Sequence, residues 1–300
     1  GRAVFHATPD PWQDEVLTAF PHHQRIAMKA SKGPGKDQPV SLMLETPDGY
    51  RRWGDIKPGD KLFAPDGTHT VVLETTLHSG NPQYKITFDD GSHTLCGLEH
   101  HWSVRGQSER TKKSQPFTVL TVEEIIQRGV RVKNGKWSGR QFEIPLYNAI
   151  QLPHQDLSID SYVLGVWLGD GSKGGGRYTG IDKEVSEEII SRGYQLGKEY
   201  KEFTRTILGI KPHLSDLCLV NLGSHERYIP NYYLKSSIQQ RKDILSGLLD
   251  TDGCIGKDGS IEFDSTSPQL ALDVVWLVRS LGGNSRMKDT IKKPFYYDKD

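Results

Sequence analysis

Hydrophobic and polar positions change their pattern twice along the chain. Between residues 37 and 150, short apolar runs alternate with the turn sequences PDG, KPGD, PDG and DDG, which predicts an all-β region. Within it, Thr121–Arg128 (TVEEIIQR) predicts one short helix with Thr121 as its cap. From residue 158 onward, longer helical periods mix with strands, which indicates an α/β region.

Two apolar segments of this second region resemble each other. They are SYVLGVWLGDGS (Ser161–Ser172) and DILSGLLDTDGCIG (Asp243–Gly256), about eighty residues apart, and each predicts a helix that ends in Asp-Gly. Apolar residues run almost all round both helices, so each is expected to be buried on every side. Gly165 and Gly247 stand mid-helix, where glycine is unfavourable, and this favours a close approach of the two helix backbones.

An aspartate ends each of the two repeated helices. If the helices pack together, Asp170 and Asp252 arrive at one end of their interface, where two carboxylates repel each other unless a cation lies between them. Mg²⁺ binds carboxylate oxygens and water in this way. Each Asp-Gly taken alone is better explained as a helix end and a turn. The matching glycines and acids of the two copies favour the metal site.

Composition limits the function classes but does not select one. The 300 residues include 38 Lys plus Arg and 38 Asp plus Glu, so no global basic excess indicates nucleic acid. Cys96, Cys218 and Cys254 are too scattered for a disulfide framework or a zinc site. No signal peptide and no apolar run of membrane length are visible, which predicts a cytoplasmic protein without a membrane partner.

The first 36 residues have the order of a nucleotide-binding loop. Trp12–Phe20 predicts a short helix and Arg25–Ala30 a strand, followed by the glycine-rich ASKGPGK that ends at Lys36. Such a loop needs Ser or Thr directly after the lysine, because that hydroxyl binds the Mg²⁺ of the nucleotide. Asp37 occupies the position instead, so the loop is interrupted.

The two Asp-Gly helices resemble the two motifs of LAGLIDADG homing endonucleases. The lead-in from Arg227, RYIPNYYLKSSIQQRKDILSGLLDTDG, is similar to the approach to the second motif in intein-borne members. This resemblance implies an αββαββα domain over residues 151–300, truncated at its C-terminal end, that cleaves DNA with Mg²⁺. It implies that Asp170 and Asp252 are the metal-binding catalytic acids. Relatives commonly have an assisting Lys where this chain has Arg227, which cannot lose its proton but can stabilise phosphate charge.

The same resemblance implies a pseudo-symmetric monomer whose strands read double-stranded DNA. The basic side chains expected to contact that DNA are Lys173, Arg177, Arg286, Lys288, Lys292 and Lys293. Taken singly, each is better explained as part of a solvated surface. The balanced charge of this region leaves open an endonuclease that no longer cuts.

Residues 37–150 resemble the N-terminal part of the Hint splicing fold. The stretch VSLMLETPDGYRRWGDIKPGDKLFAPDG and the block DGSHTLCGLEHHWSV carry the match. The second block implies that His100 polarises the upstream scissile amide, with the neighbouring His101 as an alternative. Trp102, two residues after His100, is typical of class 3 inteins, which lack a nucleophile at the first position. Core packing is the other explanation of Trp102.

Two further positions bear on the splicing class. Asp37 is no nucleophile at neutral pH, and Gly97 stands where many inteins have Thr. Both agree with class 3 splicing, which implies an internal cysteine beyond residue 300; an inactivating change at Asp37 is the alternative. Residues 37–150 would then be an incomplete Hint domain, with the splice junction at Lys36–Asp37. We expect this fragment alone to be unable to complete splicing.

Residues 1–36 would be the upstream part of the interrupted host. PWQDEVL and HHQRIAMKASKGPGK resemble the N-terminal end of phage terminase large subunits, which are DNA-packaging ATPases, and a helicase-like ATPase is the alternative host. The host residues that would bind ATP and Mg²⁺ after splicing are Gln13, Gly33, Gly35 and Lys36.

The sequence therefore favours an intein precursor with an embedded DNA endonuclease. Two other classes remain: a free-standing LAGLIDADG endonuclease with an unrelated β-domain, and an ATPase fragment with a non-catalytic insertion.

Overall fold

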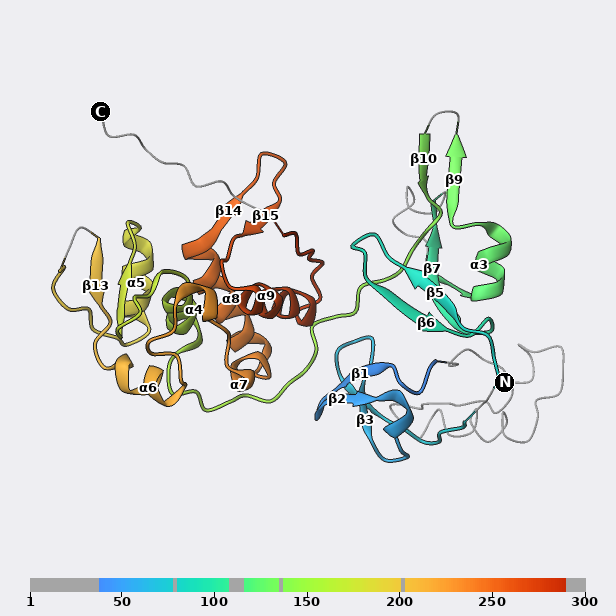
Figure 1. Ribbon diagram of the computed structural model, residues 1–300, viewed down its shortest axis with the longest axis horizontal. Helices are drawn as coiled ribbons and strands as arrows, with labels where there is room; N and C mark the ends of the chain where they lie inside the picture. The colour runs from blue at the N-terminus through green and yellow to red at the C-terminus, as the bar shows by residue number, and fades with distance from the viewer. Residues whose placement is uncertain (1–37, 78–79, 108–115, 135–136, 201–202, 290–300) are drawn as a thin grey trace. The chain divides into compact units, whose positions relative to one another are not determined.

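The computed structural model describes residues 38–77, 80–107, 116–134, 137–200 and 203–289 (Figure 1). The chain divides into two compact units, Gly1–Leu146 and Tyr147–Asp300. The expected helix and strand before residue 37, the interrupted loop and the splice junction lie outside the described residues. No helix in the described part of the chain has the length and apolar character needed to cross a membrane.

The first unit begins with three antiparallel hairpins. They are β1 (Met43–Thr46) with β2 (Gly49–Arg52), β3 (Lys61–Phe63) with β4 (His69–Val71), and β5 (Tyr84–Thr87) with β6 (His93–Cys96). The hairpins turn at the first PDG, the second PDG and the DDG, as the sequence predicts. In the last two turns Gly67 and Gly91 have φ of +82° and +84°, a backbone conformation that favours glycine.

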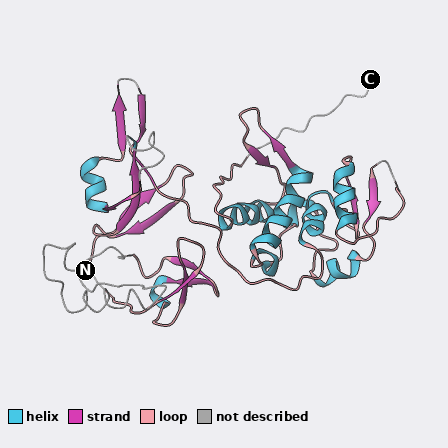
Figure 2. Cartoon of the chain, turned by 180° about the vertical axis from the view of Figure 1, so that it is seen from behind, coloured by secondary structure: helices cyan, strands magenta, loops and turns pink. Residues whose placement is uncertain are grey.

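The rest of this unit is a small sheet with one helix. Its elements are η1 (Trp53–Asp55), β7 (His101–Gly106), β8 (Thr118–Thr121), α3 (Val122–Arg128), β9 (Arg131–Asn134), β10 (Trp137–Arg140) and β11 (Phe142–Glu143). Strand β7 lies between β8 and β11, and β9 pairs with β10. The predicted helix is confirmed: the Thr121 hydroxyl accepts the amide of Glu124 at 3.1 Å, and the Glu124 carboxylate accepts the amide of Thr121 at 2.8 Å. Strands dominate this unit (Figure 2).

The second unit mixes helices with two small antiparallel sheets. Its elements are α4 (Ser161–Asp170), β12 (Arg177–Thr179), α5 (Lys183–Ser191), β13 (Thr204–Thr206), α6 (Ile210–Asp216), η2 (Ser224–Glu226), α7 (Asn231–Leu234), α8 (Ile238–Asp252), β14 (Gly253–Ile255), β15 (Ile261–Phe263) and α9 (Pro268–Ser280). The described part of the chain is therefore a mixed α/β structure.

The order of elements differs between the two halves of this unit. The second half runs α8–β14–β15–α9, the helix–strand–strand–helix order that the LAGLIDADG resemblance implies. In the first half α5 lies between the paired strands β12 and β13, which departs from the expected αββα order. The reason is local: Val185 and Ile189 are four residues apart and buried, so this segment forms an amphipathic helix.

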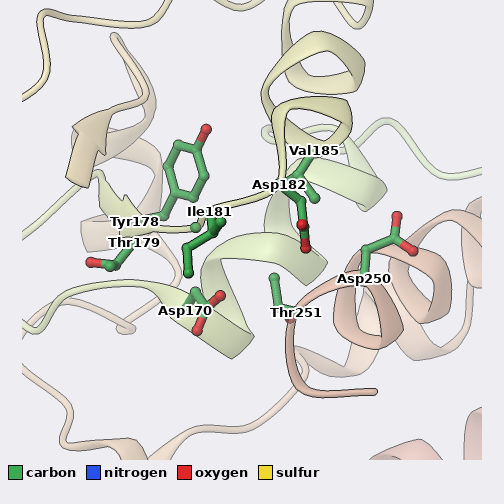
Figure 3. Close-up of a pocket in the computed structure, with 9 residues that line it drawn as sticks. Asp170, Tyr178, Thr179, Ile181, Asp182, Val185, Asp250 and Thr251 are labelled. Carbon is green, nitrogen blue, oxygen red and sulfur yellow. The ribbon is translucent and has the colours of Figure 1, made fainter. Parts of the chain in front are cut away.

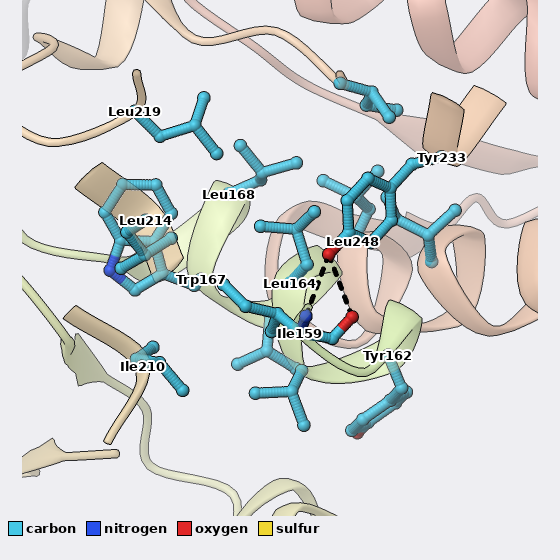
Figure 4. Close-up of a cluster of buried hydrophobic side chains, with 14 of the residues drawn as sticks. Ile159, Tyr162, Leu164, Trp167, Leu168, Ile210, Leu214, Leu219, Tyr233 and Leu248 are labelled. Atoms are coloured by element: carbon cyan, nitrogen blue, oxygen red, sulfur yellow. Dashed lines mark hydrogen bonds between the residues drawn. The ribbon is translucent and has the colours of Figure 1, made fainter. Parts of the chain in front are cut away.

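Helices α4 and α8 form the centre of the second unit, and their mutual contact is the most extensive between described elements. Leu164, Trp167 and Leu168 of α4 belong to the same buried hydrophobic cluster as Leu248 of α8 (Figure 4). Every residue of α4 except its last two is buried, which confirms the prediction that this helix is buried on all sides. The same prediction is wrong for α8, because Lys242, Ser246 and Asp250 give that helix an exposed face.

The two mid-helix glycines lie against each other. A Cβ on Gly165 would be 2.4 Å from the carbonyl oxygen of Ile244, and a Cβ on Gly247 would be 2.2 Å from that of Tyr162. Real Cβ atoms do not come this close to an oxygen. The predicted close approach of the helix backbones is thus confirmed.

Arg192 ties the two central helices together near the start of α4. Its guanidinium lies 3.4 Å from Asp160, which caps α4, and 3.3 Å from Asp243 of α8. It also bonds Glu188 at 2.8 Å and lies 5.3 Å from the Tyr162 ring. These contacts fix one end of the helix pair.

Candidate metal site at the ends of the paired helices

Asp170 and Asp252 are the last residues of α4 and α8. The glycine after each donates its amide to the carbonyl four residues earlier. A Cβ on Gly171 would be 2.2 Å from that carbonyl oxygen, and one on Gly253 would be 2.3 Å from its counterpart. Both helix ends therefore require glycine for the same steric reason, and the sequence repeat is also a structural repeat.

The two acids meet at the end of the helix interface. A Cβ on Gly169 would lie 3.3 Å from Oδ2 of Asp252, so the Asp252 carboxylate reaches the residue next to Asp170. Burial, followed by the negative charge of Asp252, raises the pKa of Asp170 from 3.8 to about 6. Burial also raises the pKa of Asp252, although the Arg227 charge opposes that shift. The structure thus brings together the two acids that the sequence selects.

Neither carboxylate makes a hydrogen bond or an ion pair with the described residues, although the charge of the nearby Arg227 acts on both. Two partly buried carboxylates without partners suit a hard divalent cation such as Mg²⁺. No group of three or more candidate ligands exists in the described part of the chain. A cation held here would therefore complete its coordination with water and phosphate oxygens, as Mg²⁺ commonly does.

Arg227 lies beside the acids but is engaged by the backbone of α4. Its side chain is buried, and Nη1 donates to the carbonyls of Leu168 at 2.7 Å and Gly169 at 2.8 Å. Nη2 donates to the carbonyl of Gly171. The guanidinium carbon is 5.0 Å from the centre of the Trp167 ring. The side chain therefore caps the end of α4.

A pocket of about 280 Å³ opens next to Asp170 (Figure 3). Its other acidic lining residues are Asp182, before α5, and Asp250, near the end of α8. Asp250 Oδ2 accepts a hydrogen bond from the Tyr162 hydroxyl at 2.8 Å. Asp250 was not among the residues predicted from the sequence. The repeat does contain a signal for it, because the residue of α4 that corresponds to Asp250 is the buried Leu168, and a carboxylate in place of leucine departs from the repeat.

The predicted splicing residues lie together in the first unit. His100 stands in the turn before β7, and its amide donates to the Gly97 carbonyl at 3.2 Å. Its ring centre is 5.5 Å from that of Trp102, which packs edge-on against Phe88 at 5.8 Å. The Nε1 of Trp102 is buried without a hydrogen-bond partner in the described residues. Cys96, which ends β6, is fully buried.

The predicted DNA-binding residues fall into two groups on the second unit. Lys173 and Arg177 are exposed in and just before β12, and the Arg177 guanidinium lies 4.4 Å from the Tyr200 ring. Arg286 and Lys288 are exposed after α9. The remaining predicted contacts, Lys292 and Lys293, and the nucleotide-binding residues Gln13, Gly33, Gly35 and Lys36 lie outside the described residues.

Comparison with protein families identifies the second helix repeat. Residues 239–298 match the family described as LAGLIDADG-like domain. This segment contains nearly all of α8, both strands β14 and β15, helix α9 and Asp252. The chain therefore carries a LAGLIDADG-like domain in this segment, and its small antiparallel sheets are compatible with that class.

Curated relatives share more of the chain. It is 30% identical over 272 residues to the replicative DNA helicase DnaB of Mycobacterium intracellulare, which covers 86% of this chain and 44% of that protein. It is 37% identical over 90 residues to the replicative DNA helicase DnaB of Mycobacterium leprae (strain TN), covering 30% of this chain and 15% of that protein. The chain thus spans less than half the length of these relatives. Neither is a terminase, so the predicted terminase host, phage origin and ATP binding have no support from these relatives.

Proposed function

We propose that the chain belongs to an intein that interrupts an ATPase and carries a Mg²⁺-dependent endonuclease for double-stranded DNA. The main observation in favour of the endonuclease is a pair of partly buried carboxylates without hydrogen bonds or ion pairs. They lie at matching ends of two helices that pack through their glycines. The family match over residues 239–298 supports the same assignment.

In this proposal Asp170 and Asp252 hold the cation between them. When bound, Mg²⁺ would supply charge stabilisation at the scissile phosphate and a lowered pKa for attacking water. The rigid helix pair fixes where the two carboxylates stand, because the contact of Gly165 with Gly247 leaves no room for sliding. The exposed Lys173, Arg177, Arg286 and Lys288 would neutralise DNA phosphates on either side. The endonuclease would act as a pseudo-symmetric monomer in the cytoplasm.

The splicing part of the proposal rests on the first unit. The β-hairpin order and the pairing of His100 with Trp102 support a Hint-type domain of class 3. His100 would donate a proton to the amide leaving group at the upstream junction. The names of the curated relatives favour a replicative helicase as the host over a terminase.

The endonuclease is tested by nicking of DNA that contains the uninterrupted host gene. We expect Mg²⁺-dependent cleavage by the chain, and a loss of at least about a hundredfold in Asp170→Asn and in Asp252→Asn, because either change removes a charged metal ligand. Asp216→Asn is the matched control, since Asp216 also ends a helix, α6, is exposed, and does not line the pocket next to Asp170. Full activity of either site variant would refute the assignment.

A free-standing endonuclease with an unrelated β-domain is the second candidate, supported by the division into two compact units. The sequence that follows residue 300 in the gene separates the two. An intein requires a terminal Asn followed by Ser, Thr or Cys, and a free-standing enzyme requires neither.

A further inference from the structure

Arg227 places a buried positive charge at the C-terminal end of α4. Its side chain is hydrogen-bonded to carbonyls of Leu168 and Gly169 through Nη1, and to that of Gly171 through Nη2; Nη1 also lies 3.3 Å from the carbonyl of Trp167. The last carbonyls of a helix lack partners within it, and they carry partial negative charge. One guanidinium therefore bonds the carbonyls of Trp167, Leu168 and Gly169 in the final turn, from which Asp170 projects, and the carbonyl of the residue that follows the helix.

The backbone of Arg227 is itself held by helix α9. The Ser267 hydroxyl, which caps α9, donates to the carbonyl of Arg227 at 2.6 Å. The Asp273 carboxylate, also on α9, accepts the amide of Ile229 at 2.8 Å. The segment that carries Arg227 is thus fixed to α9, and its side chain crosses from there to the end of α4.

These contacts leave Arg227 poorly placed to touch a DNA phosphate. The residue is only 4% exposed, and both of its amino nitrogens are occupied by carbonyls. Its Nε is buried without a hydrogen-bond partner in the described residues. It forms no ion pair with Asp170 or Asp252 within that part of the chain.

We propose that Arg227 is a positioning residue, which fixes the last turn of α4 and hence the place of the Asp170 carboxylate, and that it does not contact the reacting phosphate. The proposal rests on the endonuclease function proposed above. A lysine could not replace it, because a single ammonium cannot span the carbonyls of one helical turn as a planar guanidinium does.

The test compares Arg227→Lys with the unchanged chain in two measurements. Ca²⁺ binding without DNA is measured by calorimetry, and the rate of DNA nicking is measured against Mg²⁺ concentration. A positioning role predicts about tenfold weaker Ca²⁺ binding and a similar rise in the Mg²⁺ concentration for half-maximal rate, with the rate at saturating Mg²⁺ nearly unchanged. Unchanged Ca²⁺ binding with a reduced saturating rate would instead assign Arg227 a catalytic contact and overturn the proposal.

Arg192→Lys is the matched control, because Arg192 also clamps α4 to neighbouring elements but does so at the opposite end. It should leave Ca²⁺ affinity unchanged; an equal loss of affinity in Arg192→Lys would show a general effect of loosening α4 and contradict the proposal.

If Arg227→Lys does not fold, Ser267→Ala is the second variant. It should also weaken Ca²⁺ binding, by a smaller factor, and unchanged binding would contradict the proposal. An unchanged chain that neither binds Ca²⁺ nor cuts would overturn the proposed function itself, whereas normal Ca²⁺ binding and Mg²⁺ dependence in Arg227→Lys would overturn only the role of Arg227.

Discussion

At the residue scale, the acid pair makes the free protein less stable than it would otherwise be. Asp170 has a pKa of about 6 in the folded chain, against 3.8 for an unperturbed carboxyl. In the absence of a cation, the folded state therefore favours the protonated acid, and stability falls as the pH rises from about 4 to about 6. A bound cation would remove this penalty.

The first prediction follows from that shift. Without divalent cations, Asp170→Asn should be more stable than the unchanged chain at pH 7, because Asn carries no charge to bury. A rise in the pKa of Asp170 from 3.8 to about 6 corresponds to roughly 3 kcal/mol, and partial exposure reduces the expected gain to about 1 kcal/mol. The gain should vanish near pH 4, where Asp170 is protonated in the folded state. Thermal unfolding at both pH values measures it, and an equal gain at both would show that ionisation is not the cause.

The second prediction concerns the glycine contact. Gly165→Ala should destabilise the second unit by about 3 kcal/mol, because its Cβ would overlap the carbonyl of Ile244. Gly174→Ala is the control, since a Cβ at Gly174 meets nothing within 4 Å and its φ is not positive. Denaturant unfolding of the two variants should differ by nearly this whole amount, and similar midpoints would contradict the close approach.

At the element scale, local patterns predicted the helices α3, α4 and α8 and the three hairpins, but not helix α5 or the pairing of strands far apart in the sequence. The periodic apolar residues of Ser161–Asp170 and the cap at Thr121 were sufficient to place α4 and α3. The turn sequences placed the hairpins β1–β2, β3–β4 and β5–β6, because their glycines enforce the turn. The pairing of β12 with β13 was missed, since Arg177 and Thr204 are 27 positions apart, a helix lies between them, and no local signal joins the strands.

The third prediction belongs to helix α3. Thr121→Ala removes the hydroxyl that accepts the Glu124 amide and should lower the stability of the first unit by about 1 kcal/mol. Thr118→Ala is the matched control, since Thr118 is exposed on the same strand, β8, and does not cap the helix. Hydrogen exchange of the α3 amides reports the difference, and equal exchange in both variants would argue against the cap.

At the scale of the whole molecule, the two units have separate cores. One buried cluster lies around α4 and α8, and a smaller one contains Val104, Leu120 and Ile125 of the first unit. The sequence could select the two acids because each helix repeats its signal. It could not show that Arg227 is committed to the carbonyls of α4, because that contact joins residues about sixty positions apart.

The fourth prediction is that the two proposed activities, splicing and DNA nicking, can be lost independently. In a precursor that contains this chain and its downstream sequence, His100→Ala should abolish cleavage at the upstream junction and leave DNA nicking unchanged. Asp252→Asn should do the reverse. His101→Ala is the matched control for His100, because the neighbouring ring is exposed on β7. Gel analysis of spliced product and a nicking assay on the same preparations measure both activities; loss of splicing only in His101→Ala would move the role by one residue.

The contact between Gly165 and Gly247 also predicts how the sequence of such an intein would change during evolution. These glycines hold up the fold whether or not DNA is cut, whereas Asp170 and Asp252 weaken the fold unless they have a cation to bind. In a lineage that is no longer selected for DNA cleavage, the two acids should therefore be substituted early, whereas the two glycines should be retained. Related inserts with both glycines but without both acids would be silent nucleases that still fold.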